Sequence, residues 1–169
     1  MNISRSYGDR HLVLEKLAAD RAMRPGASSS RGRAVHPRGI HQHLAMIQTY
    51  QRQGGLVSWD EAAMLLGRHR DQPISVLARW IVARDVLSFV WQTETLVPLF
   101  QFRIADMTLR GGAREVMAEL AGAFDDLDLA AWFASPNCWL DNVAPVVVIE
   151  TNQPAVLQAA RADRYLVRS

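Results

Sequence analysis

Two short apolar segments joined by a tight polar turn are the feature that most restricts how this chain can fold. The segments are Trp59–Leu66 (WDEAAMLL) and Ile74–Arg84. Ser58 and Glu61 fit a capping box before the first segment, because the serine hydroxyl can accept from the backbone N–H of Glu61 while the glutamate reaches back. Pro73 suits the first position of the second segment. The pattern predicts two helices in a helix-turn-helix arrangement.

A β-hairpin is expected directly after these two helices. Val86–Trp91 and Leu96–Phe102 are rich in Val, Phe, Leu and Trp, and they flank the polar residues Gln92–Thr95. Proline has no backbone N–H, so Pro98 confines its strand to a sheet edge or to an irregular end. A hairpin in this position is often called a wing.

The remaining segments are mostly helical in pattern. Residues 24–39 are rich in Gly, Ser, Pro and Arg and predict a mobile linker or arm. Further helices are expected at residues 9–23, 40–53, 113–124, 127–134 and 153–166, and residues 145–150 fit either a short helix or an extended piece. The predicted fold is mainly α with a small β-hairpin. Its parts are a basic N-terminal arm and linker (1–39), a helix-turn-helix-like region with the hairpin (40–104) and a small helical C-terminal domain (105–169).

Apolar spacing also predicts which faces of two helices are buried. In the second helix of the helix-turn-helix, the expected inner face is Ile74, Leu77, Ala78 and Ile81, with Val76 and Trp80 beside it. In the closing helix, the residues expected to point inward are Val156, Leu157, Ala160 and Tyr165. The second helix of the helix-turn-helix is apolar nearly all round, which is typical of a buried helix or of one in a dimer interface.

Length and cysteine usage are those of a cytoplasmic globular protein. The chain has 169 residues, 49% of them hydrophobic, which is enough for a core without disulfides or metal. Its single cysteine, Cys138, cannot form an internal bridge. No run approaches the ~20 apolar residues of a membrane span, and the first ten residues lack the apolar stretch of a signal peptide. No membrane partner is expected.

Charge is divided unequally between the two halves of the chain. Residues 1–84 hold thirteen basic against six acidic residues, and residues 85–169 hold six against eleven, so net charges of +7 and −5 give the total of +2. From Arg21 to Trp59 there are six arginines and no acid. A polyanion such as DNA is the natural partner of the basic half, although arginine-rich tails can also serve only for solubility.

DNA contacts are assigned to the arm, the turn and the second helix. In a helix-turn-helix the second helix presents its first turns to the major groove while basic turns hold phosphates, and a flexible arm can follow the backbone or the minor groove. The candidate DNA-binding residues are Arg31, Arg33 and Arg38 in the arm, Arg68, His69 and Arg70 in the turn, and Ser75 and Arg79 on the second helix.

Enzyme signatures are weak, and neither a catalytic site nor a metal or cofactor is predicted. All five histidines lie at or before His69, far in sequence from Cys138. His36–His43 (HPRGIHQH) offers three imidazoles without a nearby cysteine or acid. The acidic run Phe124–Asp128 lacks the spacing of a calcium loop and fits the acidic N-terminus of a helix.

Two motifs, in this order and at this separation, resemble a known family. Val97–Phe102 (VPLFQF) follows the predicted helices and hairpin, and Trp132–Leu140 (WFASPNCWL) precedes Pro145 and a closing helix. Over roughly residues 56–165, this arrangement is similar to bacterial proteins that carry the Xre/MbcA/ParS antitoxin toxin-binding domain.

The resemblance implies an antitoxin of a type II toxin–antitoxin pair, usually with a RES-type toxin that consumes NAD. In that family the C-terminal domain occludes the toxin's active-site entrance, and the N-terminal part dimerises and binds operator DNA. The toxin-binding residues carried over by the family's pattern are Trp132, Pro136, Asn137, Leu140 and Pro145. A homodimer, a cognate toxin and operator DNA are the expected partners. The alternative is an orphan DNA-binding regulator whose C-terminal domain dimerises or recruits another protein.

Four further toxin-facing residues are expected from their own chemistry. Trp139 is the one large side chain here for which exposure is of interest, since it lies between Cys138 and Leu140, just after the turn dipeptide Pro136–Asn137. Cations on or after the closing helix could compete for a pocket built for an anionic cofactor. These cations are Arg161, Arg164 and Arg168.

The chain departs from the family pattern at two places. Asp141-Asn142 stands where the family usually has a glycine pair, and both residue types tolerate the left-handed backbone, so the turn can survive. Pro145–Ile149 (PVVVI) is more β-branched than the helix that the family has there.

Overall fold

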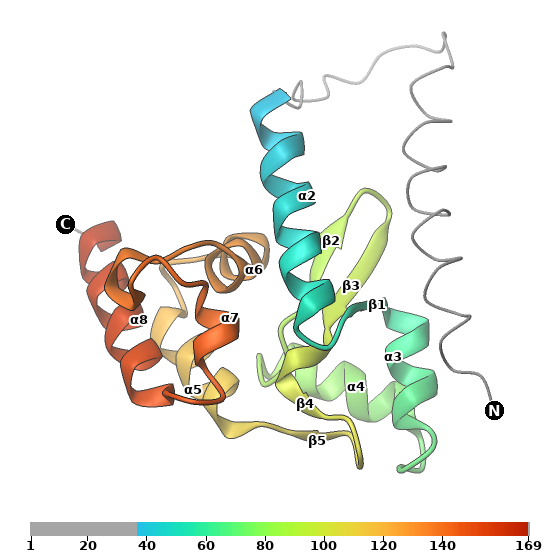
Figure 1. Cartoon of the computed structure of the whole chain (residues 1–169). Coiled ribbons are helices and arrows are strands. Elements are labelled where there is room, and N and C mark those ends of the chain that lie inside the picture. Colours follow the sequence, from blue (N-terminus) through green and yellow to red (C-terminus); the bar gives the residue numbers. More distant parts are fainter. Residues whose placement is uncertain (1–36, 169) are drawn as a thin grey trace, which may run out of the picture. The chain divides into compact units, whose positions relative to one another are not determined.

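The computed structural model describes residues 37–168, with side chains from residue 43 to residue 167. This part of the chain is mainly helical with a small antiparallel sheet, and it belongs to one compact unit (Figure 1). Among the described residues, no helix combines the length and the apolar character needed to cross a membrane.

The first part of the described chain runs from α2 to β3. Its helices are α2 (Pro37–Arg52), α3 (Trp59–Leu66) and α4 (Pro73–Val82). Its strands are β1 (Leu56–Ser58), β2 (Phe89–Trp91) and β3 (Glu94–Pro98), which form one antiparallel sheet in the order β1-β3-β2. The sequence order is therefore helix, strand, two helices and hairpin.

The second part is helical apart from one short ribbon. A 3₁₀ helix (Leu99–Gln101) leads into β4 (Phe102–Arg103) and β5 (Thr108–Leu109), which pair antiparallel. The helices that follow are α5 (Gly111–Leu120), α6 (Asp126–Ala134), α7 (Pro145–Val148) and α8 (Gln153–Arg168). A second 3₁₀ helix, Cys138–Leu140, lies between α6 and α7.

The predicted capping box is present at the start of α3. The Ser58 hydroxyl accepts from the backbone N–H of Glu61 at 3.2 Å, and the Glu61 carboxylate accepts from the Ser58 N–H at 3.2 Å. Both donors would otherwise lack a partner in the first turn of the helix. The bounds of α3 match the prediction, and α4 begins at Pro73 as expected.

The hairpin is present with a tighter turn than predicted. Strands β2 and β3 pair so that Trp91 faces Glu94, which leaves only Gln92 and Thr93 in the turn, and Gln92 has a positive φ of 58°. Strand β1 was not predicted, because three residues directly before a helix are too few to show the alternation of apolar and polar side chains that indicates a strand. It pairs with β3, so β3 is the central strand and Pro98 occupies its irregular end, opposite Leu56.

One apolar core joins the predicted helix-turn-helix-like region to the predicted C-terminal region. Tyr50 of α2 is fully buried, and its hydroxyl donates to the Ala130 carbonyl of α6 at 2.7 Å. Phe100 stacks on Tyr50 and contacts Phe133 of α6, with ring centroids 5.9 and 5.1 Å apart. The same cluster includes Leu120 of α5. Segments on both sides of residue 104 therefore share this core.

A second core lies between α3, α4 and the sheet, and it corrects the predicted inner face of α4. Leu77 is buried and Val76, Trp80 and Ile81 pack against this cluster, whereas Ile74 is 63% exposed. These four residues form the inward-facing stripe of α4, with the spacing i, i+1, i+4, i+5. This stripe, and not one that includes Ile74, faces the core because it places the large Trp80 ring against the ring of Phe102. The prediction that Ile74 points inward was wrong.

Gln101 explains why a polar residue lies inside the apolar VPLFQF motif. Its side chain is 1% exposed, and its amide both accepts from the Leu87 N–H at 2.7 Å and donates to the Leu87 carbonyl at 2.8 Å. It also donates to the Pro98 carbonyl at 2.8 Å. One buried amide thus satisfies backbone groups just before β2 and at the end of β3, as buried polar groups require hydrogen-bond partners.

The closing helix α8 packs along α5. Val156 and Ala160 are fully buried and Leu157 is partly buried, as predicted. Tyr165 is 73% exposed, so the prediction that it points inward was wrong. Arg164 already reaches the Glu119 carbonyl near the end of α5, and Tyr165 therefore lies beyond the surface that α5 offers.

Candidate partner-binding surfaces

The Pro-Asn corner, residues 135–144, is a turn held by its own backbone and side chains. Helix α6 ends before Ser135, whose N–H donates to Ala131, and the chain then forms an isolated antiparallel bridge between Asn137 and Val143. Asp141 and Asn142 have φ of 54° and 60°. The predicted left-handed pair is thus confirmed, and it turns the chain back without glycine.

Asn137 is the centre of the corner and is 8% exposed. Its side-chain oxygen accepts from the Trp139 N–H at 2.9 Å, and its backbone carbonyl accepts from Leu140 and Asn142 at 3.0 and 2.9 Å. Its side-chain amide donates to an oxygen of Asp163 in α8 at 2.7 Å. Asparagine suits this position because one side chain must both accept and donate.

Asp163 gathers the N–H groups of the corner on one carboxylate. Its Oδ2 accepts from the Trp132 indole at 2.7 Å and from the Asn137 amide at 2.7 Å, and its Oδ1 accepts from the Trp139 indole at 2.9 Å. Asp163 is only half-buried. Asp163 is not among the residues predicted from the sequence. The available signal was that two tryptophans and an asparagine in one apolar corner need an acceptor, which the closing helix could supply.

The toxin-binding residues carried over from the family pattern divide between scaffold and surface. Trp132, Asn137, Leu140 and Pro145 are buried, and Pro145 begins α7, so the β-branched stretch forms a short helix. Pro136 is exposed. Trp139 is exposed over 54% of its surface, while its indole N–H is bound to Asp163.

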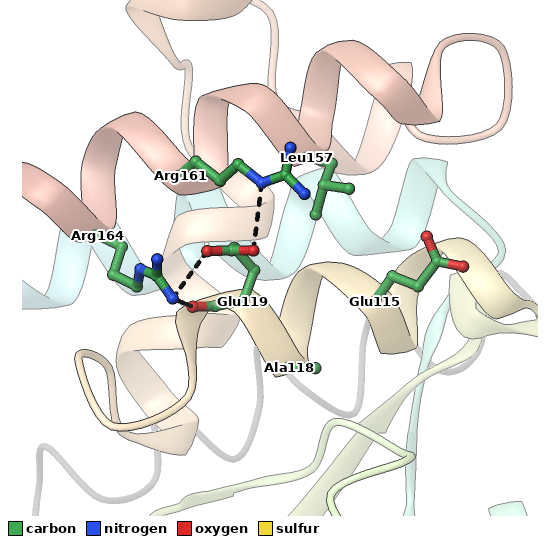
Figure 2. A pocket seen from close by; sticks show the side chains of 6 residues that line it. All are labelled: Glu115, Ala118, Glu119, Leu157, Arg161 and Arg164. Carbon is green, nitrogen blue, oxygen red and sulfur yellow. Dashed lines mark hydrogen bonds and ion pairs between the residues drawn. The ribbon is translucent and has the colours of Figure 1, made fainter.

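Arg161 and Arg164 are committed to an internal contact on the other side of α8. Figure 2 shows both side chains directed at Glu119 of α5, with N–O distances of 3.3 Å for Arg161 and 2.8 Å for Arg164. They line an open groove together with Glu115, Ala118, Glu119 and Leu157. Both guanidinium groups thus share one carboxylate of the chain and are not directed at the corner. The side chain of Arg168 lies outside the described part.

The candidate DNA-binding residues that the structure describes are all on the surface. Arg68, His69 and Arg70 are exposed in the turn between α3 and α4. Ser75 and Arg79 are exposed on α4, one helical turn apart. Arg31 and Arg33 lie outside the described residues, as does the side chain of Arg38. Exposed Ile74 and Val82, which is 85% exposed, share this outer side of α4.

No protein-family model, curated protein or solved structure matches this chain. Among the side chains that the structure describes, no group of three or more His, Cys, Asp or Glu residues is placed to hold a metal ion. The corner exposes a tryptophan, and the turn between α3 and α4 exposes basic side chains.

Proposed function

We propose that this protein is the antitoxin of a type II toxin–antitoxin pair. It binds and neutralises a RES-type, NAD-consuming toxin through the corner, and it represses its own operon by binding operator DNA through the basic turn and α4. The observation that carries the proposal is that Trp139 is exposed and yet held in place, because its indole is bound to Asp163 and its backbone to the buried Asn137.

The exposure of Trp139 supports a protein partner because a large aromatic ring gains most from burial. Tryptophan is among the residues that most often dominate the affinity of protein interfaces. Hydrogen bonds to Asp163 and Asn137 hold this residue at its ring and at its backbone. Such a pre-ordered side chain loses little conformational entropy on binding, which favours affinity.

The region from α2 to β3 supports DNA binding by its order of elements and by the basic side chains that it exposes in the turn and on α4. Its elements follow in the order helix, strand, two helices and hairpin, which is the order of a helix-turn-helix followed by a wing. The exposed Arg68 and Arg70 suit phosphate contacts, while Ser75 and Arg79 suit base edges. The exposed Ile74 fits this reading, because apolar side chains can contact thymine methyl groups.

Co-expression with the product of the adjacent reading frame tests the toxin-binding part. The wild-type chain should restore growth that this product inhibits, and the Trp139→Ala variant should restore it poorly while remaining folded. Val90→Ala is the matched control, because Val90 is 63% exposed on the hairpin and should bind as the wild type does. An adjacent product that is not toxic, or toxicity that this chain does not relieve, would contradict the antitoxin assignment.

Binding to DNA from upstream of the gene tests the second part. Arg68→Ala and Arg70→Ala should each weaken binding and lower the slope of log affinity against log salt by about 0.9, the value for one lost phosphate contact. DNA binding without a toxic neighbour would favour the alternative of an orphan regulator. Absence of binding at low salt would contradict both DNA-binding readings.

A further inference from the structure

The exposed ring of Trp139 is held at its N–H edge. Its Nε1 already donates to Oδ1 of Asp163, and its backbone N–H donates to Asn137. A partner therefore cannot use the indole N–H as a hydrogen-bond donor unless it displaces Asp163. More than half of the surface of Trp139 stays accessible, and the faces of an indole ring carry partial negative charge.

Asp163 brings a full negative charge to the edge of this ring without a cation of its own. Among the side chains described from residue 43 to residue 167, its partners are the N–H groups of Trp132, Asn137 and Trp139. The nearby Arg161 and Arg164 pair with Glu119 instead. Within the described part of the chain, the Asp163 carboxylate is thus hydrogen-bonded to neutral N–H groups and has no ion-pair partner.

The carboxylate also has room for another donor. Each carboxylate oxygen can accept about two hydrogen bonds. From the described residues, Oδ2 accepts two hydrogen bonds and Oδ1 accepts one, from Trp139. Asp163 is half-buried, so Oδ1 is the side on which an incoming donor can bind without breaking the corner.

We propose that Trp139 and Asp163 together form a receptor for a cationic side chain, preferably arginine, on the partner protein. A guanidinium group can stack on the indole face and donate to Oδ1 of Asp163 at the same time. Arginine suits this geometry better than lysine, because its planar group stacks and presents several donors. The inference rests on the proposed function and deepens it by naming the chemistry of the toxin surface that the corner contacts.

The chain alone tests this inference by NMR. The indole N–H signal of Trp139, assigned by its loss in Trp139→Phe, would be followed during titration with acetyl-Gly-Arg-Gly-amide or with the uncharged acetyl-Gly-norleucine-Gly-amide. The arginine peptide should move the Trp139 signal about threefold further than the norleucine peptide, since only the cation gains from the ring and the carboxylate together. The signals of the other four tryptophans serve as internal controls.

Two variants connect the response to the carboxylate. Asp163→Asn should abolish the preference for the arginine peptide, and a retained signal dispersion for Trp132 would show that the corner is still folded. Glu94→Gln removes an exposed acid on the hairpin and should leave the preference unchanged. The comparison of peptides on the wild-type chain needs no variant, so it holds even if Asp163→Asn unfolds.

Equal responses to both peptides would show an apolar contact surface and overturn the inference, as would no response to either. Neither result involves the toxin, so the antitoxin assignment would still stand or fall by co-expression. A preference for arginine together with failed co-expression would support the receptor and contradict only the assignment of its partner.

Discussion

Two of the carboxylates that link helix α8 to its neighbours, Asp163 and Glu119, differ in character. On one side Asp163 accepts three neutral N–H groups from α6 and the corner. On the other side Glu119 of α5 accepts from Arg161 and Arg164. One link thus consists of directed hydrogen bonds to a carboxylate, and the other consists of ion pairs.

The difference between the Asp163 link and the Glu119 link indicates which of them fixes the shape of the corner. The ion pairs join side chains with exposures of 59% and 39% for the arginines and 16% for Glu119, so water competes for these charges and the pairs contribute little. The Asp163 link includes Asn137, which is 8% exposed, and a buried donor that loses its acceptor is costly. We therefore expect the hydrogen bonds to Asp163, here called the corner link, to contribute more to the free energy of unfolding than the Glu119 ion pairs do. We also expect them to fix the position of Trp139.

The largest effect is expected from Asn137→Asp, which breaks the corner link with almost no change in shape. The new carboxylate would face Asp163 at the 2.7 Å distance now spanned by a hydrogen bond. Loss of the donor and repulsion between like charges should lower the free energy of unfolding by about 2–4 kcal/mol at pH 7, measured by urea denaturation. Part of this loss should be regained near pH 4, where one proton can be shared between the two carboxyl groups.

Asn142→Asp is the matched control for this substitution. It makes the same chemical change five residues away, at an exposed position with a left-handed backbone that Asp also tolerates. Its effect should stay within about 0.5 kcal/mol. If both variants lose equal stability, the corner link has no special weight.

A third polar link, between α2 and α6, is expected to have an intermediate effect that depends on pH. Tyr50→Phe removes the hydrogen bond from the buried hydroxyl to Ala130 and should cost about 1 kcal/mol at pH 7. Burial raises the pKa of Tyr50 well above its usual value of 10.0. The stability that the neutral Tyr50 hydroxyl contributes is therefore fully present below pH 10.0. It is lost as the pH rises above this value, because the hydroxyl ionises at a lower pH in the unfolded chain than in the folded one.

Urea denaturation at pH 8 and at pH 10.8 separates the two effects of Tyr50→Phe. The variant should be less stable than the wild type at pH 8, and this deficit should shrink or reverse at the higher pH, because phenylalanine does not ionise. Tyr165→Phe, at a position 73% exposed, should show no such change with pH. A deficit that stays constant from pH 8 to pH 10.8 would contradict a hydroxyl held neutral by burial.

Features set by neighbouring residues could be predicted from the sequence, and those set by distant contacts could not. The capping box at Ser58 and the left-handed pair at Asp141 depend on a few adjacent residues, and both are present as predicted. Strand β1 depends on pairing with β3, and the burial of Trp80 in place of Ile74 depends on Phe102. Asp163 lies twenty or more residues from each of its donors, so no local pattern could reveal it.

The smallest effect is expected from Glu119→Gln, which removes the charge from the other link of α8 while keeping its shape. Arg161 and Arg164 would retain a neutral acceptor and contact with water, so the loss should be about 0.5–1 kcal/mol and should shrink as salt is raised to 1 M. Glu94→Gln on the hairpin is the control for removing one negative charge. A loss from Glu119→Gln as large as that from Asn137→Asp, or one that does not respond to salt, would reverse the order of the two links. It would then make the groove face of α8, rather than the corner, the part that fixes how the closing helix is placed.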